Sequence, residues 1–407
     1  MEYAKKHVLI WGAIFLALVG LVLAIHQLYV MCIVLALLPT GSYLMSRNTL
    51  GALAVSREAP GVVKEGERRR VRLLVSNEGL RRRYFLTVAD QVPDGLQVVG
   101  DAATLIASLA SEEQVEVEYE VEAMRRGVFT LGPALLRHSD LIGLFRFARE
   151  AGGTEEIVVH PTPERVPEDW TRATAIRAMQ RPRRRFRGEG TELYGTRQYV
   201  PGDDLRRVDW KSTARRGALI VREYERAEAT DCVILLDLQA RPHAGQGNDS
   251  TLERGVKVAA SLSAYMLARG SGVGLVAAGA DDWSRPPSAD PRQRIELLDA
   301  LARVQADGER PLAAQFASHR QMLPAGGLIA VVSPTREVAA VELATRILRE
   351  GYAVAWMVLA APWRNQDRDE LTEEQLAARL ASRGVRAYVI EPGRELIVSM
   401  RRAYRVA

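Results

Sequence analysis

The 407-residue chain contains few of the residues that build stapled, metal-bound or phosphate-binding proteins. It has only two cysteines and six histidines, and Cys32 and Cys232 lie far apart in apolar stretches. This argues against a disulfide framework and a zinc site, and indicates a reducing compartment. No glycine-rich loop joins a strand to a helix, and there is no nucleophile elbow. We therefore expect a non-enzymatic protein without cofactors, which binds no nucleic acid.

Charge is also missing from two long runs near the N-terminus. Residues 8–25 and 28–45 are mostly apolar and contain no charged residue, and only a short polar break separates them. Because a membrane helix needs about 20 apolar residues, we expect residues 1–50 to form a transmembrane helical hairpin. A secretory signal peptide fits less well, since no small-residue cleavage pattern follows the first run. A buried soluble hairpin is the remaining alternative.

Basic residues flank this hairpin on one side only. Lys5 and Lys6 precede the first run and Arg47 follows the second, whereas the connection carries neither lysine nor arginine. Both ends of the hairpin should therefore face the cytoplasm. The bulk of the chain would then be cytoplasmic.

The rest of the chain divides into three regions by pattern. Residues 51–160 alternate between apolar and polar positions with frequent turns, which predicts an antiparallel β-sandwich. Residues 161–198 form a connection rich in proline and arginine, whose run 181–187 is either solvated or contacts anionic lipid or an acidic partner. Residues 199–407 begin with a charged segment and continue as alternating apolar strands and amphipathic helices. This predicts an α/β doubly wound parallel sheet, with ligands beyond the strand C-termini.

Asp237 ends the first strand of that sheet, at the position from which a carboxylate could hold a divalent cation. Such a site needs hydroxyl ligands at the next two alternate positions, but these are Gln239 and Arg241. Ser333 and Thr335 follow the third strand without an acid, and the second strand ends near residues 281–282, which are both aspartate. We expect no metal here, although a metal-dependent binder centred on Asp237 remains an alternative.

The segment 199–217 reads YVPGDDLRRVDWKSTARRG and carries eight charged residues around one tryptophan. Asp203, Asp209 and Lys211 loosely fit the carboxylates and lysine of a magnesium-dependent nuclease or hydrolase. That arrangement needs a strand, however, and residues 206–217 have the pattern of a helical turn. Charge-paired packing of the loop around Trp210 as an apolar plug is one alternative, and recognition of a partner is another.

Residues 190–239 closely resemble the signature of a bacterial family, the domain of unknown function fifty-eight. The resemblance extends over nearly the whole chain, including the two apolar runs and the segment 125–145. The residues of the signature, which we expect to form an interaction motif, are Arg197, Tyr199, Pro201, Gly202, Asp203, Asp204, Arg206, Asp209, Trp210, Lys211, Ala214, Arg215, Gly217, Arg222 and Glu223.

The resemblance implies a von Willebrand factor A-like α/β domain and an association with MoxR-type AAA+ ATPases, which look like chaperones that mature or assemble other proteins. It also implies a multi-pass protein of the bacterial inner membrane. In intact A-domains a metal site binds an acidic ligand from a partner, and Gln239 and Arg241 depart from that pattern. We therefore expect a membrane-anchored interaction module whose partner is a MoxR-type ATPase, a client protein or both.

Overall fold

A computed structural model describes residues 2–23, 25–101, 103–140, 142–168, 170, 187–188, 192–200, 204, 208–225, 230–361 and 370–404. The chain folds as two compact units, Met1–Pro161 and Thr162–Ala407. The division lies next to the boundary expected after residue 160.

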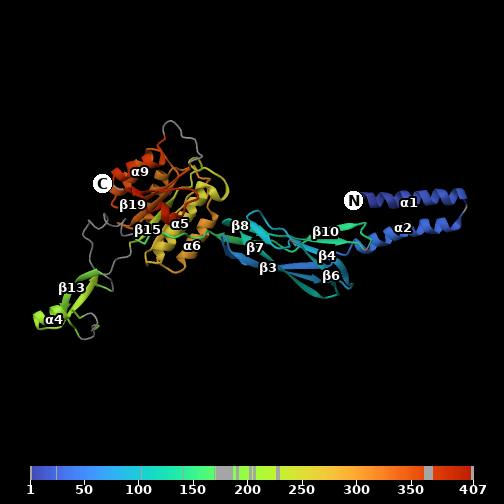
Figure 1. Cartoon of the computed structure of the whole chain (residues 1–407), viewed down its shortest axis with the longest axis horizontal. Helices are drawn as coiled ribbons and strands as arrows, with labels where there is room; N and C mark the ends of the chain where they lie inside the picture. The colour runs from blue at the N-terminus through green and yellow to red at the C-terminus, as the bar shows by residue number, and fades with distance from the viewer. Residues whose placement is uncertain are drawn as a thin grey trace. The chain divides into compact units, whose positions relative to one another are not determined.

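Two antiparallel helices begin the first unit, α1 (Glu2–Leu23) and α2 (His26–Ser46) (Figure 1). They approach closely because Gly20 has no side chain, so that Leu28 of α2 can pack against its backbone. The expected helical hairpin is therefore present, but its second helix begins at His26 and not at residue 28 as predicted. By length and composition α2 is apolar enough to cross a membrane, and the apolar part of α1, His7–Leu23, is shorter.

The β domain of the first unit contains two four-stranded sheets and one three-stranded sheet, in the orders β1-β3-β7-β5, β10-β9-β4-β6 and β2-β11-β8. The strands are β1 (Leu53–Glu58), β2 (Val62–Lys64), β3 (Arg68–Asn77), β4 (Arg83–Asp90), β5 (Leu96–Val99), β6 (Ala103–Leu109), β7 (Gln114–Ala123), β8 (Gly127–Leu131), β9 (Ala134–Ser139), β10 (Arg146–Ala151) and β11 (Glu155–His160).

The three sheets enclose two apolar cores. Val75 of β3 and Leu136 of β9 belong to the core between the two larger sheets, which is the expected sandwich. Val71 of the same strand belongs to a second core with residues of the three-stranded sheet, such as Ile157. The prediction of a purely antiparallel domain was wrong at one place, because β2 and β11 pair in parallel.

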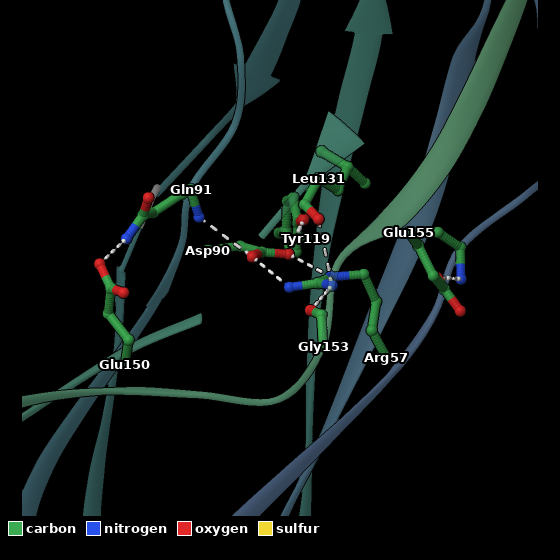
Figure 2. A network of polar contacts seen from close by, with 9 residues as sticks. Arg57, Asp90, Gln91, Tyr119, Leu131, Glu150, Gly153 and Glu155 are labelled. Atoms are coloured by element: carbon green, nitrogen blue, oxygen red, sulfur yellow. Dashed lines mark hydrogen bonds and ion pairs between the residues drawn. The ribbon is translucent and has the colours of Figure 1, made fainter. Parts of the chain in front are cut away.

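A buried polar network lies where these two cores meet, beside Tyr119, which packs against both of them (Figure 2). Arg57 binds the Asp90 carboxylate through Nε and Nη2 at 2.8 and 2.6 Å. The Tyr119 hydroxyl donates to the same carboxylate at 2.5 Å, and Arg57 also donates to the carbonyls of Leu131 and Gly153. The network thereby joins strands β1, β4 and β7.

The second unit contains a small antiparallel sheet of order β12-β14-β13. Its strands are β12 (Arg187–Gly188), β13 (Glu192–Gln198) and β14 (Ile220–Glu225), and helix α4 (Trp210–Arg216) lies between β13 and β14 in the chain. The region 161–198, expected as a connection rich in proline and arginine, contains β13 at its C-terminal end, where β13 pairs with β14. The Arg-rich run 181–187 lies outside the described residues except for Arg187.

The start of the same predicted connection is held on the α/β core rather than forming a solvated linker. Trp170 is 1% exposed and packs edge-on against Tyr265 of the α/β core. Glu164 accepts hydrogen bonds from Arg254 and from the backbone N–H of Leu396. Proline and arginine are common in linkers, but a single tryptophan provides enough apolar surface to hold such a segment on a core.

The main sheet of this unit has seven strands in the order β17-β16-β15-β18-β19-β20-β21. The five central strands are parallel, and β17 and β21 are antiparallel edges that the sequence pattern did not predict. The strands are β15 (Cys232–Leu236), β16 (Val273–Val276), β17 (Arg285–Ser288), β18 (Leu328–Ser333), β19 (Ala353–Leu359), β20 (Arg386–Ile390) and β21 (Ala403–Tyr404).

Helices cover both faces of this sheet, as expected for continuously apolar strands. Alternate residues of β15 enter two separate cores: Ile234 packs with α5 and α6, whereas Val233 packs with α7, α8 and α9. The helices are α5 (Thr251–Leu267), α6 (Gln293–Arg303), α7 (Leu312–Ser318), α8 (Ala339–Arg349), α9 (Glu373–Ser382) and α10 (Leu396–Ser399), with 3-10 turns η3 (Gly247–Asp249) and η4 (Arg320–Met322). The N-terminus of α5 is capped by Ser250, whose side chain accepts a hydrogen bond from the N–H of Glu253.

Candidate functional site

The first candidate site lies at the C-terminal edge of the sheet, between β15 and β18. β16 follows β15 in the chain but lies on its other side, so this is the point where the winding of the sheet reverses. In doubly wound folds, ligands bind at such a switch point. Asp237 follows β15 directly and Ser333 ends β18, so the sequence prediction that both lie at this edge is confirmed.

The carboxylate of Asp237 is 1% exposed and joins the loops that follow these two strands. Its Oδ2 accepts a hydrogen bond from the Ser333 hydroxyl at 2.6 Å, and its Oδ1 accepts from the Gln239 N–H at 3.0 Å. Ser333 Oγ in turn accepts from the Thr335 N–H at 2.9 Å. Burial raises the pKa of the Asp237 carboxyl to about 6, although the hydrogen bonds from Ser333 and Gln239 act in the opposite direction.

A histidine and a threonine close the loop that follows Asp237. His243 Nε2 lies 2.8 Å from the Asp237 carbonyl oxygen, which can only accept, so Nε2 carries the proton. His243 Nδ1 lies 2.9 Å from Thr251 Oγ1, and that oxygen also accepts from the Ala244 N–H. The sequence analysis did not identify these residues. A threonine at the first position of α5 was visible in the pattern, but its contact with His243 depends on how the loop folds back.

Gln239 and Arg241 occupy the positions where metal-binding hydroxyls would be needed, and neither supplies such a ligand. The backbone of Gln239 pairs with Gly308, and Arg241 is exposed. Asp282 accepts from His319 Nε2 at 2.9 Å and from the Ser284 N–H. Within the part of the chain that the structure describes, no group of three or more histidine, cysteine, aspartate or glutamate side chains could hold a metal ion.

A buried arginine fixes the loop after β18. Arg336 Nη2 lies 2.8 Å from a Glu370 carboxylate oxygen, and Nη1 lies 3.5 Å from Glu373 at the start of α9. All three side chains are largely buried, and the Leu371 N–H donates to the Arg336 carbonyl. The sequence analysis missed this cluster, because Arg336 and Glu370 are distant in sequence and resemble ordinary solvated charges. The edge of the sheet is thus braced by its own polar groups.

The second candidate site is the charged segment on the small sheet. Asp209 caps α4: its side chain accepts from the Ser212 N–H at 3.3 Å, and its own N–H donates to the Ile220 carbonyl. The predicted helical turn is therefore present and ends at Gly217, whose φ of +67° suits glycine. The strand that a nuclease arrangement would require at Asp209 and Lys211 is a helix N-terminus instead.

The surface of α4 differs from the prediction in one important respect. Trp210 is 67% exposed, so the interpretation of this side chain as an apolar plug was wrong. The hydrophobic anchors of the segment are Val208, Ile220 and Val221, which are buried. The exposed residues of α4, besides Trp210, are Lys211, Ala214, Arg215 and Arg216.

The remaining residues of the predicted motif lie in several settings. The Arg197 side chain donates a hydrogen bond to the Gln198 carbonyl. The Tyr199 N–H donates to the Leu219 carbonyl, and this bond helps to hold β13 beside β14. Asp204 is exposed. Arg222 and Glu223 belong to β14. The motif residues outside the described part of the chain are Pro201, Gly202, Asp203 and Arg206.

Comparison with solved structures gives only distant similarities. A domain of Pyrococcus furiosus protein PF1109, titled a CARDB domain, is 15% identical over 26% of this chain and 94% of that chain, at a TM-score of 0.19. Escherichia coli alpha-2-macroglobulin in its native conformation is 18% identical over 30% of this chain and 8% of that chain, at a TM-score of 0.22. Scores below 0.5 establish no shared fold.

Comparison with curated sequences gives proteins without an assigned function. Uncharacterized protein YeaD of Bacillus subtilis is 22% identical over 56% of this chain and 56% of its own length. Uncharacterized protein Rv1480 of Mycobacterium tuberculosis is 29% identical over 27% of this chain and 35% of its own length. The matches thus span about half or less of these relatives. Residues 195–333, which include the charged segment and the pair Asp237 and Ser333, match the family described as "Protein of unknown function DUF58".

Proposed function

We propose that this chain is a membrane-anchored, cytoplasm-facing interaction protein that works with a MoxR-type AAA+ ATPase in the assembly or maturation of other proteins. The observation that carries the proposal is the exposed Trp210, which stands among basic side chains on α4 inside the segment that matches the family model.

Trp210 leaves much of a large apolar ring in water, which is unfavourable for the isolated chain at about 25 cal/mol per Å². Tryptophan and arginine are enriched in the cores of protein interfaces and among the residues that dominate binding energy. Lys211, Arg215 and Arg216 are exposed on the same short helix. The partner surface that fits this helix combines an apolar pocket for the ring with acidic side chains around it.

The switch-point edge has a supporting role in this proposal. We assign the α/β domain as von Willebrand factor A-like on the basis of its strand order, its antiparallel edge strand β17 and the position of Asp237. Both carboxylate oxygens of Asp237 accept hydrogen bonds from the chain itself, and Arg241 stands where a hydroxyl would be required. Contact with the partner would therefore be independent of a bound cation.

Membrane anchoring completes the proposal. The length and composition of α2 support a membrane span, and the antiparallel pairing brings the start of α1 to the same end as Arg47. Lys5 and Lys6 lie near that end in sequence, so both ends of the hairpin are positively charged. The positive-inside rule then places the β domain and the α/β domain in the cytoplasm of a bacterium, with a multi-pass anchor in the inner membrane.

The test is co-purification of the detergent-solubilised full chain with its partners from the native membrane. We expect an AAA+ ATPase to be recovered with the wild type and lost with Trp210→Ala and Lys211→Glu. Ile295→Ala is the matched control, because it truncates another exposed apolar side chain in the same unit. All three variants should have the same melting temperature as the wild type. Absence of an ATPase from the wild-type sample, or its recovery with both α4 variants, would contradict the proposal.

A further inference from the structure

The end of α2 runs into the β domain without a flexible linker. Ser46 is buried at the helix end, and Leu50 and Leu53 belong to the core between the two larger sheets. Arg149 of β10 donates from Nη1 to the carbonyls of Leu50 at 2.6 Å and Gly51 at 3.1 Å. These bonds hold the turn that follows the helix against β10. The orientation of α2 is therefore fixed relative to the β domain.

The loop between β9 and β10 is fastened to the last turns of α2. The Tyr43 ring lies 5.3 Å from the Phe145 ring in an edge contact and 5.9 Å from the Phe147 ring. Ser42 donates its hydroxyl to Asp140 at 2.6 Å, and the other oxygen of that carboxylate accepts from the Phe145 N–H. Ile142, which lies in this loop, is 43% exposed beside the helix end.

The start of β4 lies at the same end of the domain. His138 stacks on Phe147, which contacts Tyr43, and His138 Nδ1 hydrogen-bonds to the Tyr84 carbonyl at 3.0 Å. The preceding turn is joined to the segment after α2, since the Glu78 N–H donates to the Ala52 carbonyl. Residues 78–85 therefore lie around the point where α2 enters the β domain, at the end of the domain nearest α2 (Figure 1).

Large apolar side chains are exposed all around this junction. Leu80 is 93% exposed, and Tyr84 and Phe85 are about half exposed. The backbone of Phe85 has a φ of +51°, in the left-handed region that a bulky residue rarely adopts. We define the collar as the exposed apolar residues Tyr43, Leu80, Tyr84, Phe85 and Ile142 together with the exposed arginines Arg47, Arg81, Arg82 and Arg146.

We infer that the collar lies in the phospholipid headgroup layer of the membrane that α2 crosses. Aromatic rings and leucine or isoleucine side chains partition into this layer, and arginine can bind lipid phosphates from there. Glu78, Glu112 and Glu113 lie near the turn that bears Leu80, so the surface beside the collar also carries negative charge, but the arginines of the collar outnumber these glutamates. The inference rests on the membrane anchor in the proposed function. It adds that the β domain touches the bilayer surface itself, because the rigid junction leaves no room for a gap.

The continuity of the collar with α2 indicates that lipid, rather than a protein, contacts it. Tyr43 lies in the last turns of a helix that is apolar enough to span, so its ring belongs at the boundary between hydrocarbon and headgroups. Ile142 is on the loop that packs against Tyr43, and the turn bearing Leu80 is hydrogen-bonded beside Ala52, shortly after the helix. A protein partner at this place would have to share the surface with lipid.

The experiment places a fluorescent label at single cysteines of the full chain in a Cys32→Ala, Cys232→Ala background, reconstituted in lipid nanodiscs. The labelled variants are Leu80→Cys and Ile142→Cys in the collar, with Val62→Cys as the control at an apolar site of β2 whose exposure is close to that of Ile142. Leu37→Cys, in the middle of α2, reports on the anchor itself. At the collar sites and at Val62 the readout is quenching by lipids brominated at the headgroup end of the acyl chains. At Leu37 it is quenching by lipids brominated near the end of the acyl chains. The unbrominated lipid is the reference in both cases.

We expect strong quenching at both collar sites and at Leu37, and none at Val62. Quenching at Leu37 without quenching at Leu80 and Ile142 would overturn the collar while leaving the anchor intact. Absence of quenching at Leu37 would overturn the anchor, and with it the collar. Equal quenching at Val62 and Leu80 would also overturn the inference, because the contact would then be unspecific.

Discussion

Replacing Asp237 by asparagine should stabilise the α/β unit above about pH 6, because it removes a charge that the fold buries at a cost. The carboxyl has a pKa of about 6 in the folded chain, against 3.8 for the ordinary group. Between these values the folded state binds more protons than the unfolded state. The free energy of unfolding therefore decreases as the pH rises through this window, and the full cost applies above it. The difference in pKa corresponds to about 3 kcal/mol.

The asparagine can keep both contacts of the carboxylate. Its Oδ1 can accept from the Gln239 N–H and its Nδ2 can donate to Ser333 Oγ, which leaves the serine hydroxyl to find another acceptor at a cost of about 1 kcal/mol. The net gain is then about 2 kcal/mol, or roughly 5 °C in the melting temperature of a unit of this size.

The assay is scanning calorimetry of the detergent-solubilised full chain over a series of pH values. The difference between variant and wild type cancels all titrations that they share. It should be small or negative near pH 4 and reach its full positive value near pH 8. Ser333→Ala is the complementary control: it removes the donor to the carboxylate and should lower stability by about 1–3 kcal/mol at the higher pH. An asparagine variant that is less stable at every pH, or whose difference does not depend on pH, would refute the reasoning.

Four further predictions concern other parts of the chain. Arg57→Ala should lower stability by about 3–5 kcal/mol because it leaves the buried Asp90 carboxylate without its ion pair, whereas Arg68→Ala, which breaks an exposed pair with Glu122, should cost less than about 1 kcal/mol in the same denaturant titration. Trp170→Ala should lower the free energy of unfolding by about 3–5 kcal/mol in calorimetry, and an unchanged stability would indicate that this segment is a linker. Asp209→Ala should speed hydrogen exchange in α4 by an amount equivalent to about 1 kcal/mol, with Lys211→Ala as the neutral control. Magnesium or manganese should leave the wild-type melting temperature unchanged, and a rise that disappears in Asp237→Asn would revive the metal-dependent alternative.

The five parallel strands and the four longest helices of the α/β unit were predictable because each has a clear pattern in its own stretch of sequence. The run from Cys232 to Leu236 is apolar at every position, which indicates a strand covered on both faces. The cap of α5 at Ser250 was also visible in the sequence. The edge strands β17 and β21 were missed because short, half-exposed segments such as 285–288 carry no periodic apolar pattern.

The candidate sites were predictable only in part. The position of Asp237 at a strand end was correct, since a strand end can be read from a pattern, but its partnership with Ser333 joins residues on two strands. The role of Trp210 was predicted wrongly because composition indicates that a tryptophan is apolar, and says nothing about whether the fold has room to bury it. Here Val208 and Ile220 already fill the interior of the small sheet.

The sequence by itself determined the order of the parts: two apolar helices, a β domain, a charged segment with a capped helix, and a doubly wound sheet. It did so because apolar periodicity and capping residues act over a few neighbouring positions. Only the tertiary structure decided which charges are buried and which apolar groups are exposed. Arg57, Arg336 and Asp237 are enclosed and paired, while Trp210 and Leu80 face outward. Burial depends on what distant segments bring to the same place, and that information is not contained in any local stretch of the chain.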